Sequence, residues 1–173
     1  HGLQEVGVGL GETSLFRALA HQFLGDEEKH PEIRAKVVEW MKVNGTKEWQ
    51  GTVLANHYDK DLYSSWKKYY KAMAKDSTAG DHISAVIAAE VFQHNIFIIS
   101  GGQVEETDDE RPRYLTVINP ISPSQEQLLE LPRKYVSYWP DTQQWNALSP
   151  LDPEGAEPFS DLPKRVVARC LKS

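Results

Sequence analysis

Hydrophobic residues follow a helical spacing in the first half of the chain and form short runs in the second half. Apolar side chains three and four positions apart predict helices over residues 14–24, 31–42 and 82–93 and over most of 49–74. Short runs rich in apolar residues predict strands over residues 3–6, 96–99, 114–118, 135–139 and 144–148. Because helices dominate the first half and strands the second, the pattern predicts an α+β fold with helices flanking a small central sheet.

Two stretches are less regular. The segment 49–74 carries an aromatic stripe, which we interpret as a core-facing surface with a binding ridge as the alternative. Its members are Tyr58, Leu62, Trp66, Tyr69, Tyr70 and Met73. Lysines of the same segment form a basic face that is either solvated or a partner contact: Lys67, Lys68, Lys71 and Lys75. Pro120, Pro123 and Pro132 predict a broken, irregular stretch around residues 128–131.

Composition indicates one globular domain. The 173 residues are 40% hydrophobic and 25% charged, with no internal repeat, and we expect a single domain over residues 1–149. Residues 150–173 begin with a proline-rich, acidic stretch and are expected to form an extension that packs on this domain or trails from it. A net charge of −6 argues against a nucleic-acid partner, which needs a basic face.

Cysteine content and hydropathy bear on the protein's location. The single cysteine, Cys170, excludes an intramolecular disulfide and is interpreted as an inert thiol, which fits a reducing compartment. No apolar run approaches the length of a membrane-spanning helix. We therefore expect an intracellular monomer, in the cytoplasm or nucleus. The histidines lack the spacing of metal ligands, so neither a metal nor a cofactor is expected.

Three alternating glycines, Gly7, Gly9 and Gly11, precede the first predicted helix, which begins near Ser14. Alternating glycines let a loop bend sharply and bring its N–H groups close to a ligand. The start of a helix adds unpaired N–H groups and a dipole that favours negative charge. Ser14 is therefore placed either as a helix cap or as a reactive group beside an anion-binding site.

One interpretation of these glycines is nucleotide binding. Residues 5–11, Glu-Val-Gly-Val-Gly-Leu-Gly, match the strand-to-loop pattern with which methyltransferases hold S-adenosylmethionine. That fold needs a second parallel strand ending in an acidic residue about twenty positions later, whereas residues 31–42 are predicted to be helical. A Walker-type phosphate loop is excluded because Gly-Lys-Ser/Thr is absent. The methyltransferase stays as a second alternative.

The other interpretation depends on three blocks of sequence. Residues 14–25 read Ser-Leu-Phe-Arg-Ala-Leu-Ala-His-Gln-Phe-Leu-Gly, residues 79–99 combine an Ala-Gly-Asp turn with a helix and an apolar strand, and residues 144–148 read Gln-Trp-Asn-Ala-Leu. In this order they resemble the nucleophile helix, the glycine turn with its central strand, and the closing motif of the ovarian tumour (OTU) family of cysteine deubiquitinases. The resemblance covers residues 3–148 and implies the OTU-type, papain-like fold.

The resemblance implies a catalytic site in which two of three residues differ from the family pattern. In the family a thiolate attacks the isopeptide carbonyl, a histidine activates it, and an Asn or Asp two positions later orients the histidine. The corresponding residues here are Ser14, Gln144 and Asn146. A serine hydroxyl needs a general base, and a glutamine amide cannot accept a proton near neutral pH.

Further site residues are implied by the same resemblance. The oxyanion loop would comprise Leu10, Gly11, Glu12 and Thr13, and the Glu12 carboxylate would oppose a developing negative charge. Ser14 and Asn146 are expected to line the substrate channel, with Trp139 and Trp145 as its walls. The basic face with Lys67 and Lys71 lies where OTU-like domains tend to meet ubiquitin.

The leading hypothesis is a pseudo-deubiquitinase that binds ubiquitin, a ubiquitin-like protein or another protein partner without efficient cleavage. The alternative is an active OTU deubiquitinase whose nucleophile has been replaced by engineering. No histidine follows His94 to act as the base. His57, in an Asn-His-Tyr-Asp context that mimics the closing motif, is interpreted as a surface or capping residue. His1 would serve as the base only in a permuted arrangement.

Overall fold

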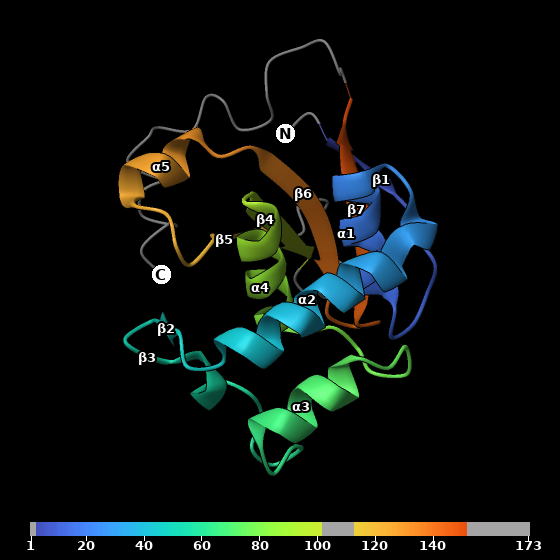
Figure 1. The fold of residues 1–173 in the computed structure, drawn as a ribbon. Coiled ribbons are helices and arrows are strands. Elements are labelled where there is room, and N and C mark those ends of the chain that lie inside the picture. The colour runs from blue at the N-terminus through green and yellow to red at the C-terminus, as the bar shows by residue number, and fades with distance from the viewer. Residues whose placement is uncertain (1–2, 102–112, 152–173) are drawn as a thin grey trace.

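The computed structural model describes residues 3–101 and 113–151, which form a five-stranded mixed sheet with helices against it (Figure 1). The strands lie in the order β1-β7-β6-β4-β5, in which β4 and β6 are parallel and the other neighbours are antiparallel. Their bounds are β1 Leu3–Val6, β4 Asn95–Gly101, β5 Arg113–Ile118, β6 Arg133–Trp139 and β7 Gln144–Pro150. Because β1 pairs with β7, the two ends of the domain lie side by side.

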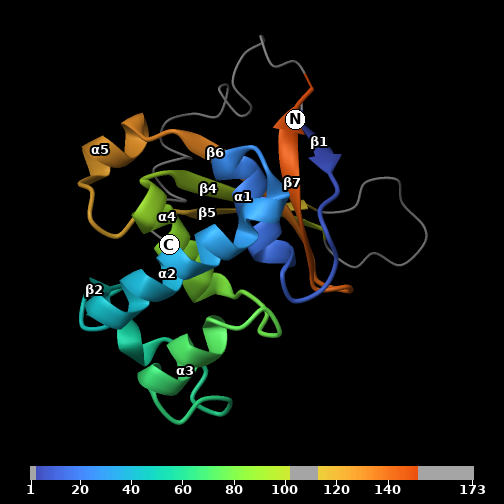
Figure 2. The same ribbon diagram turned by 45° about the vertical axis from the view of Figure 1, so that its right-hand side comes forward.

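The helices form layers above this sheet. Helices α1 and α4 contact the strands, α2 packs across both helices, and α3 lies further out against α2 (Figures 1 and 2). The helix bounds are α1 Ser14–Leu24, α2 His30–Asn44, α3 Trp66–Met73, α4 His82–Phe92 and α5 Gln125–Glu130. Short elements complete the described chain: the 3-10 turns η1 Glu27–Lys29 and η2 Leu54–Asn56, and the hairpin of β2 Glu48–Trp49 with β3 Thr52–Val53.

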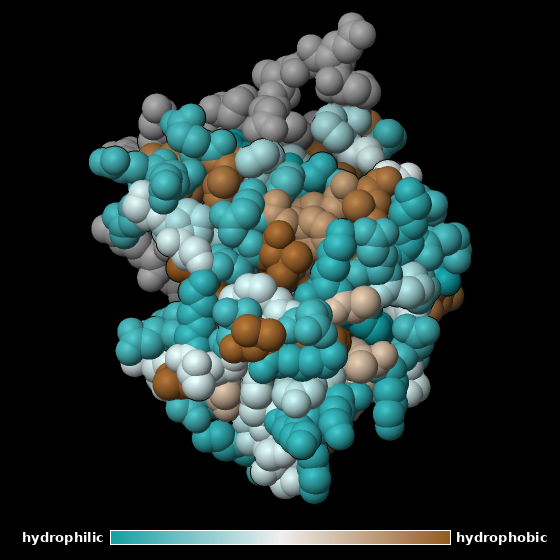
Figure 3. All heavy atoms as spheres, in the orientation of Figure 1, coloured by the Kyte–Doolittle hydropathy of each residue, from teal (hydrophilic) through white to brown (hydrophobic). Residues whose placement is uncertain are grey.

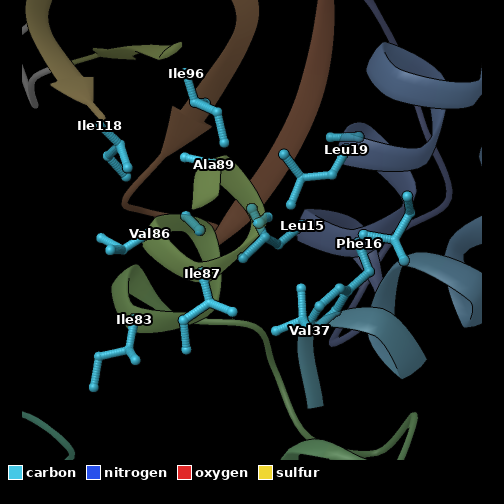
Figure 4. Close-up of a cluster of buried hydrophobic side chains, with 14 of the residues drawn as sticks. Leu15, Phe16, Leu19, Val37, Ile83, Val86, Ile87, Ala89, Ile96 and Ile118 are labelled. Carbon is cyan, nitrogen blue, oxygen red and sulfur yellow. The ribbon is translucent and has the colours of Figure 1, made fainter. Parts of the chain in front are cut away.

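The main core fills the space between the helices and the sheet (Figure 4). Side chains from α1, α2, α4 and two strands converge there: Leu15, Phe16, Leu19, Val37, Ile83, Val86, Ile87, Ala89, Ile96 and Ile118. Strand residues alternate between faces, so a second buried cluster lies on the opposite face of the sheet. It contains Phe97, Val117, Tyr135 and Leu148.

The α+β prediction is confirmed, but two of the expected elements differ. The segment 49–74 is not mostly helical, because only α3 is an α-helix there. Gln50 and Gly51 both have positive φ and form the two-residue turn of the β2–β3 hairpin, whose twist suits such turns. Further along, Ser65 caps α3 by accepting a hydrogen bond from the Lys68 N–H at 3.2 Å.

The stretch around residues 128–131 is also more regular than predicted. Instead of breaking the chain, Pro123 directly precedes the N-cap of helix α5. Ser124 accepts a hydrogen bond from the Gln127 N–H, and the Gln127 side chain accepts one in return from the Ser124 N–H. This capping box stabilises the start of the helix and was the sequence signal for it.

The aromatic stripe is mostly core, as predicted. Tyr69 and Met73 are fully buried, and Tyr58, Trp66 and Tyr70 pack against the same core cluster with part of their surface exposed. Leu62 is the exception, with 73% of its surface exposed. Both burial and the neighbouring Asp81 carboxylate raise the pKa of the Tyr69 phenol, which therefore stays protonated and donates to Asp81. The stripe thus anchors the turn that leads into α4.

Candidate functional site

Ser14 begins helix α1 at the end of the glycine loop, residues 7–13. The preceding residue, Thr13, is the N-cap and makes no side-chain capping bond. Gly11 has φ +89°, which only glycine adopts readily, and its carbonyl accepts a 2.9 Å hydrogen bond from the Ser14 N–H. Ser14 is buried, and its Oγ accepts a 3.4 Å hydrogen bond from the Trp145 N–H. Ser14 is therefore not a helix cap but a hydroxyl held against β7.

The three positions implied by the family resemblance lie where α1 approaches β7: Ser14 contacts the Trp145 backbone, and Gln144 contacts Asn146. The Gln144 amide Nε2 donates to the Trp145 carbonyl at 2.7 Å and to Asn146 Oδ1 at 3.3 Å. Asn146 Oδ1 also accepts a 3.4 Å hydrogen bond from the Val8 N–H. Asn146 therefore ties the glycine loop to the closing strand, while the Gln144 amide uses its donors on neighbouring groups of β7.

A cleft of about 610 Å³ opens beside Ser14. Its walls come from the glycine loop, the turn before α4, the central strands and the β6–β7 turn. They comprise Gly11, Glu12, Ser14, Ala79, Gly80, Asp81, His82, Ile98, Ser100, Thr116, Tyr138, Thr142, Gln143 and Trp145. The charged side chains among them are the carboxylates of Glu12 and Asp81, so the lining favours a neutral or cationic occupant.

The predicted site residues divide between the cleft and its surroundings. Four of them line the cleft: Gly11, Glu12, Ser14 and Trp145. Four others are sequence neighbours of lining residues but do not line the cleft themselves: Leu10, Thr13, Gln144 and Asn146. Leu10 is 82% exposed, and Thr13 accepts a hydrogen bond from the Arg17 side chain. Lys67 and Lys71 are exposed on α3, away from the lining, and this end of the surface is mostly hydrophilic (Figure 3).

Trp139 also lies outside the lining, and its neighbour Tyr138 takes the place expected for it. The Trp139 Nε1 donates a 2.7 Å hydrogen bond to Glu5 on β1. Tyr138 is the register partner of Trp145, and their rings contact each other with centroids 4.5 Å apart. Since successive strand residues point to opposite faces, the alternation along β6 was the signal that could have placed Tyr138 in the wall.

Sequence reasoning also missed His82, which lines the cleft beside Asp81. The residue as a whole is exposed, but its ring lies 5.7 Å from the ring of Trp49, which also contacts His57 at 4.6 Å. This partial burial lowers the pKa of His82; Asp81 opposes the shift, and His57 adds to it. His57 itself contacts the Trp49 carbonyl at 3.1 Å and is not a cleft residue.

Buried residues of the core fix the position of the turn that carries Asp81. Asp81 caps α4 in a capping box with Ser84 and accepts hydrogen bonds from the Tyr69 hydroxyl at 2.9 and 3.0 Å. Gly80 lies directly on α1: a Cβ there would be 2.6 Å from Leu15 Cδ2 and 2.9 Å from Phe16 Cε2. The close approach of this turn to α1 therefore requires glycine.

We expect Gly80→Ala to lower the free energy of unfolding by about 1–3 kcal/mol, because Leu15 and Phe16 are buried and cannot swing away. Urea denaturation of the purified chain measures the change. Gly7→Ala is the matched control, since nothing lies within 4 Å of a Cβ at that position. Equal losses of stability in the two variants would contradict the steric argument.

The described residues contain no group of three or more His, Cys, Asp or Glu arranged to hold a metal ion. None of the described helices is long and apolar enough to cross a membrane. His1, Cys170 and nearly all of the extension 150–173 lie outside the described residues, so the interpretations given to them stay predictions.

Comparison with known proteins bears on the fold and the site together. No family model matches the chain. The OVARIAN TUMOR DOMAIN-containing deubiquitinating enzyme 12 of Arabidopsis thaliana is 30% identical over 100 residues, which are 58% of this chain and 41% of that protein. The match thus spans about two fifths of this relative's length.

Solved OTU domains share the architecture. The OTUD1 OTU domain has a TM-score of 0.65 at 14% identity, with 85% of both chains covered. An OTU domain in complex with ubiquitin has a TM-score of 0.62 at 12% identity, covering 97% of this chain and 81% of that one. An OTU deubiquitinase from Wolbachia pipientis wMel bound to ubiquitin has 0.59 at 12% identity, covering 87% and 97%.

The mixed sheet, the helices packed on it and the meeting of the first helix with the last strand define an α+β domain of the OTU type. The chain therefore has the fold of OTU domains, and over 58% of its length its sequence is similar to that of an OTU deubiquitinating enzyme.

Proposed function

We propose that this OTU domain is a pseudo-deubiquitinase: it binds ubiquitin, or a ubiquitin-like protein, in the cleft beside Ser14 and does not cleave it efficiently. The observation that carries the proposal is the side chain at the base position. Gln144 presents an amide nitrogen that already donates to Trp145 and Asn146, and an amide cannot take a proton from Ser14. The base position therefore offers no proton acceptor to Ser14.

The surroundings of Ser14 support the same conclusion. Ser14 Oγ accepts a hydrogen bond from the Trp145 backbone, and within residues 3–101 and 113–151 no imidazole or carboxylate is hydrogen-bonded to it. The Ser14 N–H is a donor that could face an oxyanion, but it already donates a hydrogen bond to the Gly11 carbonyl. Glu12 adds a negative charge to the same loop, which would oppose a negatively charged intermediate.

The architecture favours ubiquitin as the first partner to test. OTU structures similar to this chain were solved in complex with ubiquitin. The cleft is lined by carboxylates and aromatic rings, which suits a peptide with basic side chains. Lys67 and Lys71 on α3 are proposed as a separate, peripheral contact, because both are exposed.

The methyltransferase alternative gains no support. Strand β1 is an edge strand antiparallel to β7, whereas cofactor binding by a glycine loop of that kind needs a central parallel strand. Helix α2 follows α1 after the short turn η1, with no strand between them. An active deubiquitinase with an engineered nucleophile is the remaining alternative, and a reaction with ubiquitin distinguishes it.

We expect isothermal titration calorimetry to show saturable binding of ubiquitin to the wild-type chain, and a ubiquitin probe with a C-terminal electrophile to leave Ser14 unlabelled. Tyr138→Ala should weaken binding because Tyr138 lines the cleft, while Trp139→Ala should change it little because Trp139 does not. Ser14→Ala is the control for the probe. Labelling of wild-type protein that Ser14→Ala abolishes would refute the pseudoenzyme, and absence of ubiquitin binding would refute the partner.

A further inference from the structure

The glycine loop is held by two charged residues that lie outside it. Glu27, on η1, accepts a 3.2 Å hydrogen bond from the Gly9 N–H through Oε2 and a 3.2 Å bond from Arg17 Nη1 through Oε1. Arg17, on α1, donates through Nε to Thr13 Oγ1 at 3.3 Å. The middle of the loop and its last residue are thus joined to one ion pair.

The Arg17 side chain also occupies the space above Gly9. A Cβ on Gly9 would lie 2.8 Å from Arg17 Nε and 2.9 Å from its Cδ. Both partners of the ion pair are shielded, with side-chain exposures of 19% for Arg17 and 31% for Glu27. Gly9 is therefore required for the approach of this arginine, and its N–H is directed to Glu27 rather than to a ligand.

We propose that Glu27 is a positioning residue: with Arg17 it fixes the glycine loop so that Gly11, Glu12 and Ser14 form one wall of the cleft. The inference rests on the proposed function in one respect, since it treats that cleft as the binding site. Loss of the Glu27 carboxylate frees the Gly9 N–H and removes one of the two carboxylates that orient Arg17. The wall then fluctuates, although the hydrophobic core beneath α1 is untouched.

Glu28 supplies the matched control. It pairs with the same Arg17 nitrogen at 2.6 Å, but its side chain is 70% exposed and no described contact joins it to the loop backbone. Its hydrogen bond is the main reason that the pKa of Arg17 is raised. Either single substitution still leaves the guanidinium charged, because arginine is not deprotonated in proteins. Glu27→Ala and Glu28→Ala therefore remove equal charge from neighbouring positions and differ in one contact, the Gly9 N–H.

Amide hydrogen exchange in the full chain, read by mass spectrometry over the peptide containing residues 7–13, tests the inference without any ligand. We expect Glu27→Ala to accelerate exchange at Gly9 about tenfold, as for loss of a charge-assisted hydrogen bond, and Glu28→Ala to change it less than about twofold. Both variants should keep the wild-type urea midpoint. Glu27→Gln, which keeps an acceptor for Gly9, should restore slow exchange. Equal exchange in the two alanine variants overturns the proposal. It is also overturned if Glu27→Ala shifts the urea midpoint without accelerating exchange at Gly9.

Ubiquitin titration of the same variants separates this inference from the proposed function. If wild-type protein binds ubiquitin, Glu27→Ala should raise the Kd at least about fivefold more than Glu28→Ala. Equal affinities would overturn the positioning role. If wild-type protein does not bind ubiquitin, the proposed partner is wrong, while the exchange experiment still decides whether Glu27 holds the loop.

Discussion

The double variant Ser14→Cys/Gln144→His is expected to react with the electrophilic ubiquitin probe at least about 10²-fold faster than Ser14→Cys alone. Cysteine provides an intrinsically stronger nucleophile, and a positioned general base contributes about 10²–10⁴-fold. The structure already contains the orienting group: Asn146 Oδ1 accepts from the Gln144 side chain at 3.3 Å and could accept from an imidazole N–H in its place. Residue 14 lies beside the same strand through its bond to the Trp145 N–H.

Two controls make this outcome specific. Adding Asn146→Ala to the double variant should remove most of the gain, because the imidazole loses its orienting acceptor. The reaction rate of the double variant should rise with pH as the introduced histidine loses its proton. The rate of Ser14→Cys alone should instead rise as the cysteine thiol ionises. A folded, ubiquitin-binding double variant that does not react would show that more than these two side chains has been lost, with the Gly11 bond to the Ser14 N–H as the next group to change.

The hydrophobic pattern predicts most of the fold because the elements show one of two simple apolar patterns. Helix α2 buries one regular face with Ile33, Val37 and Met41, whereas α4 and β4 are buried on nearly all sides and carry continuous apolar runs. The helix prediction for the segment before α3 is wrong because aromatic residues spaced by three and four also occur in a loop that packs around one buried ring, that of Tyr69. Tyr58 stacks on Tyr69 at 5.8 Å, and Tyr63 meets the same ring edge-on at 5.4 Å.

The site is only partly predictable for a different reason. The family resemblance assigns Ser14, Gln144 and Asn146 to one site; in the structure Gln144 donates to Asn146, and Ser14 accepts from the backbone of Trp145, which lies between them on β7. Alternation along β6 indicates that Tyr138 and Trp139 point to opposite faces, and the register of β6 with β7 shows that Tyr138 is the one opposite Trp145. The alternating glycines serve different purposes, because Gly9 accommodates Arg17 and Gly11 adopts a positive φ. Those roles depend on contacts with residues outside the motif.

The largest loss of stability is expected from Arg34→Ala, which should lower the free energy of unfolding by about 3–5 kcal/mol. Arg34 lies on α2 with 3% of its side chain exposed, and its Nη1 donates to the carbonyls of Met73 at 2.9 Å and Thr78 at 3.0 Å. Its guanidinium also lies 4.0 Å from the centre of the Phe16 ring and pairs with Asp76 at 3.2 Å. Burial lowers the pKa of Arg34, and Asp76 opposes that shift.

The cost is high because alanine leaves two backbone carbonyls without their donor and opens a cavity against Phe16. Urea denaturation measures it, with Lys36→Ala as the control, since Lys36 on the same helix forms an exposed pair with Glu32 worth under about 1 kcal/mol. Arg34 holds the chain between α3 and Gly80, so local exchange at the 79–81 turn should also increase beyond the change in global stability. A loss for Arg34→Ala no larger than for Lys36→Ala would mean that the buried guanidinium is not what fixes this wall of the cleft.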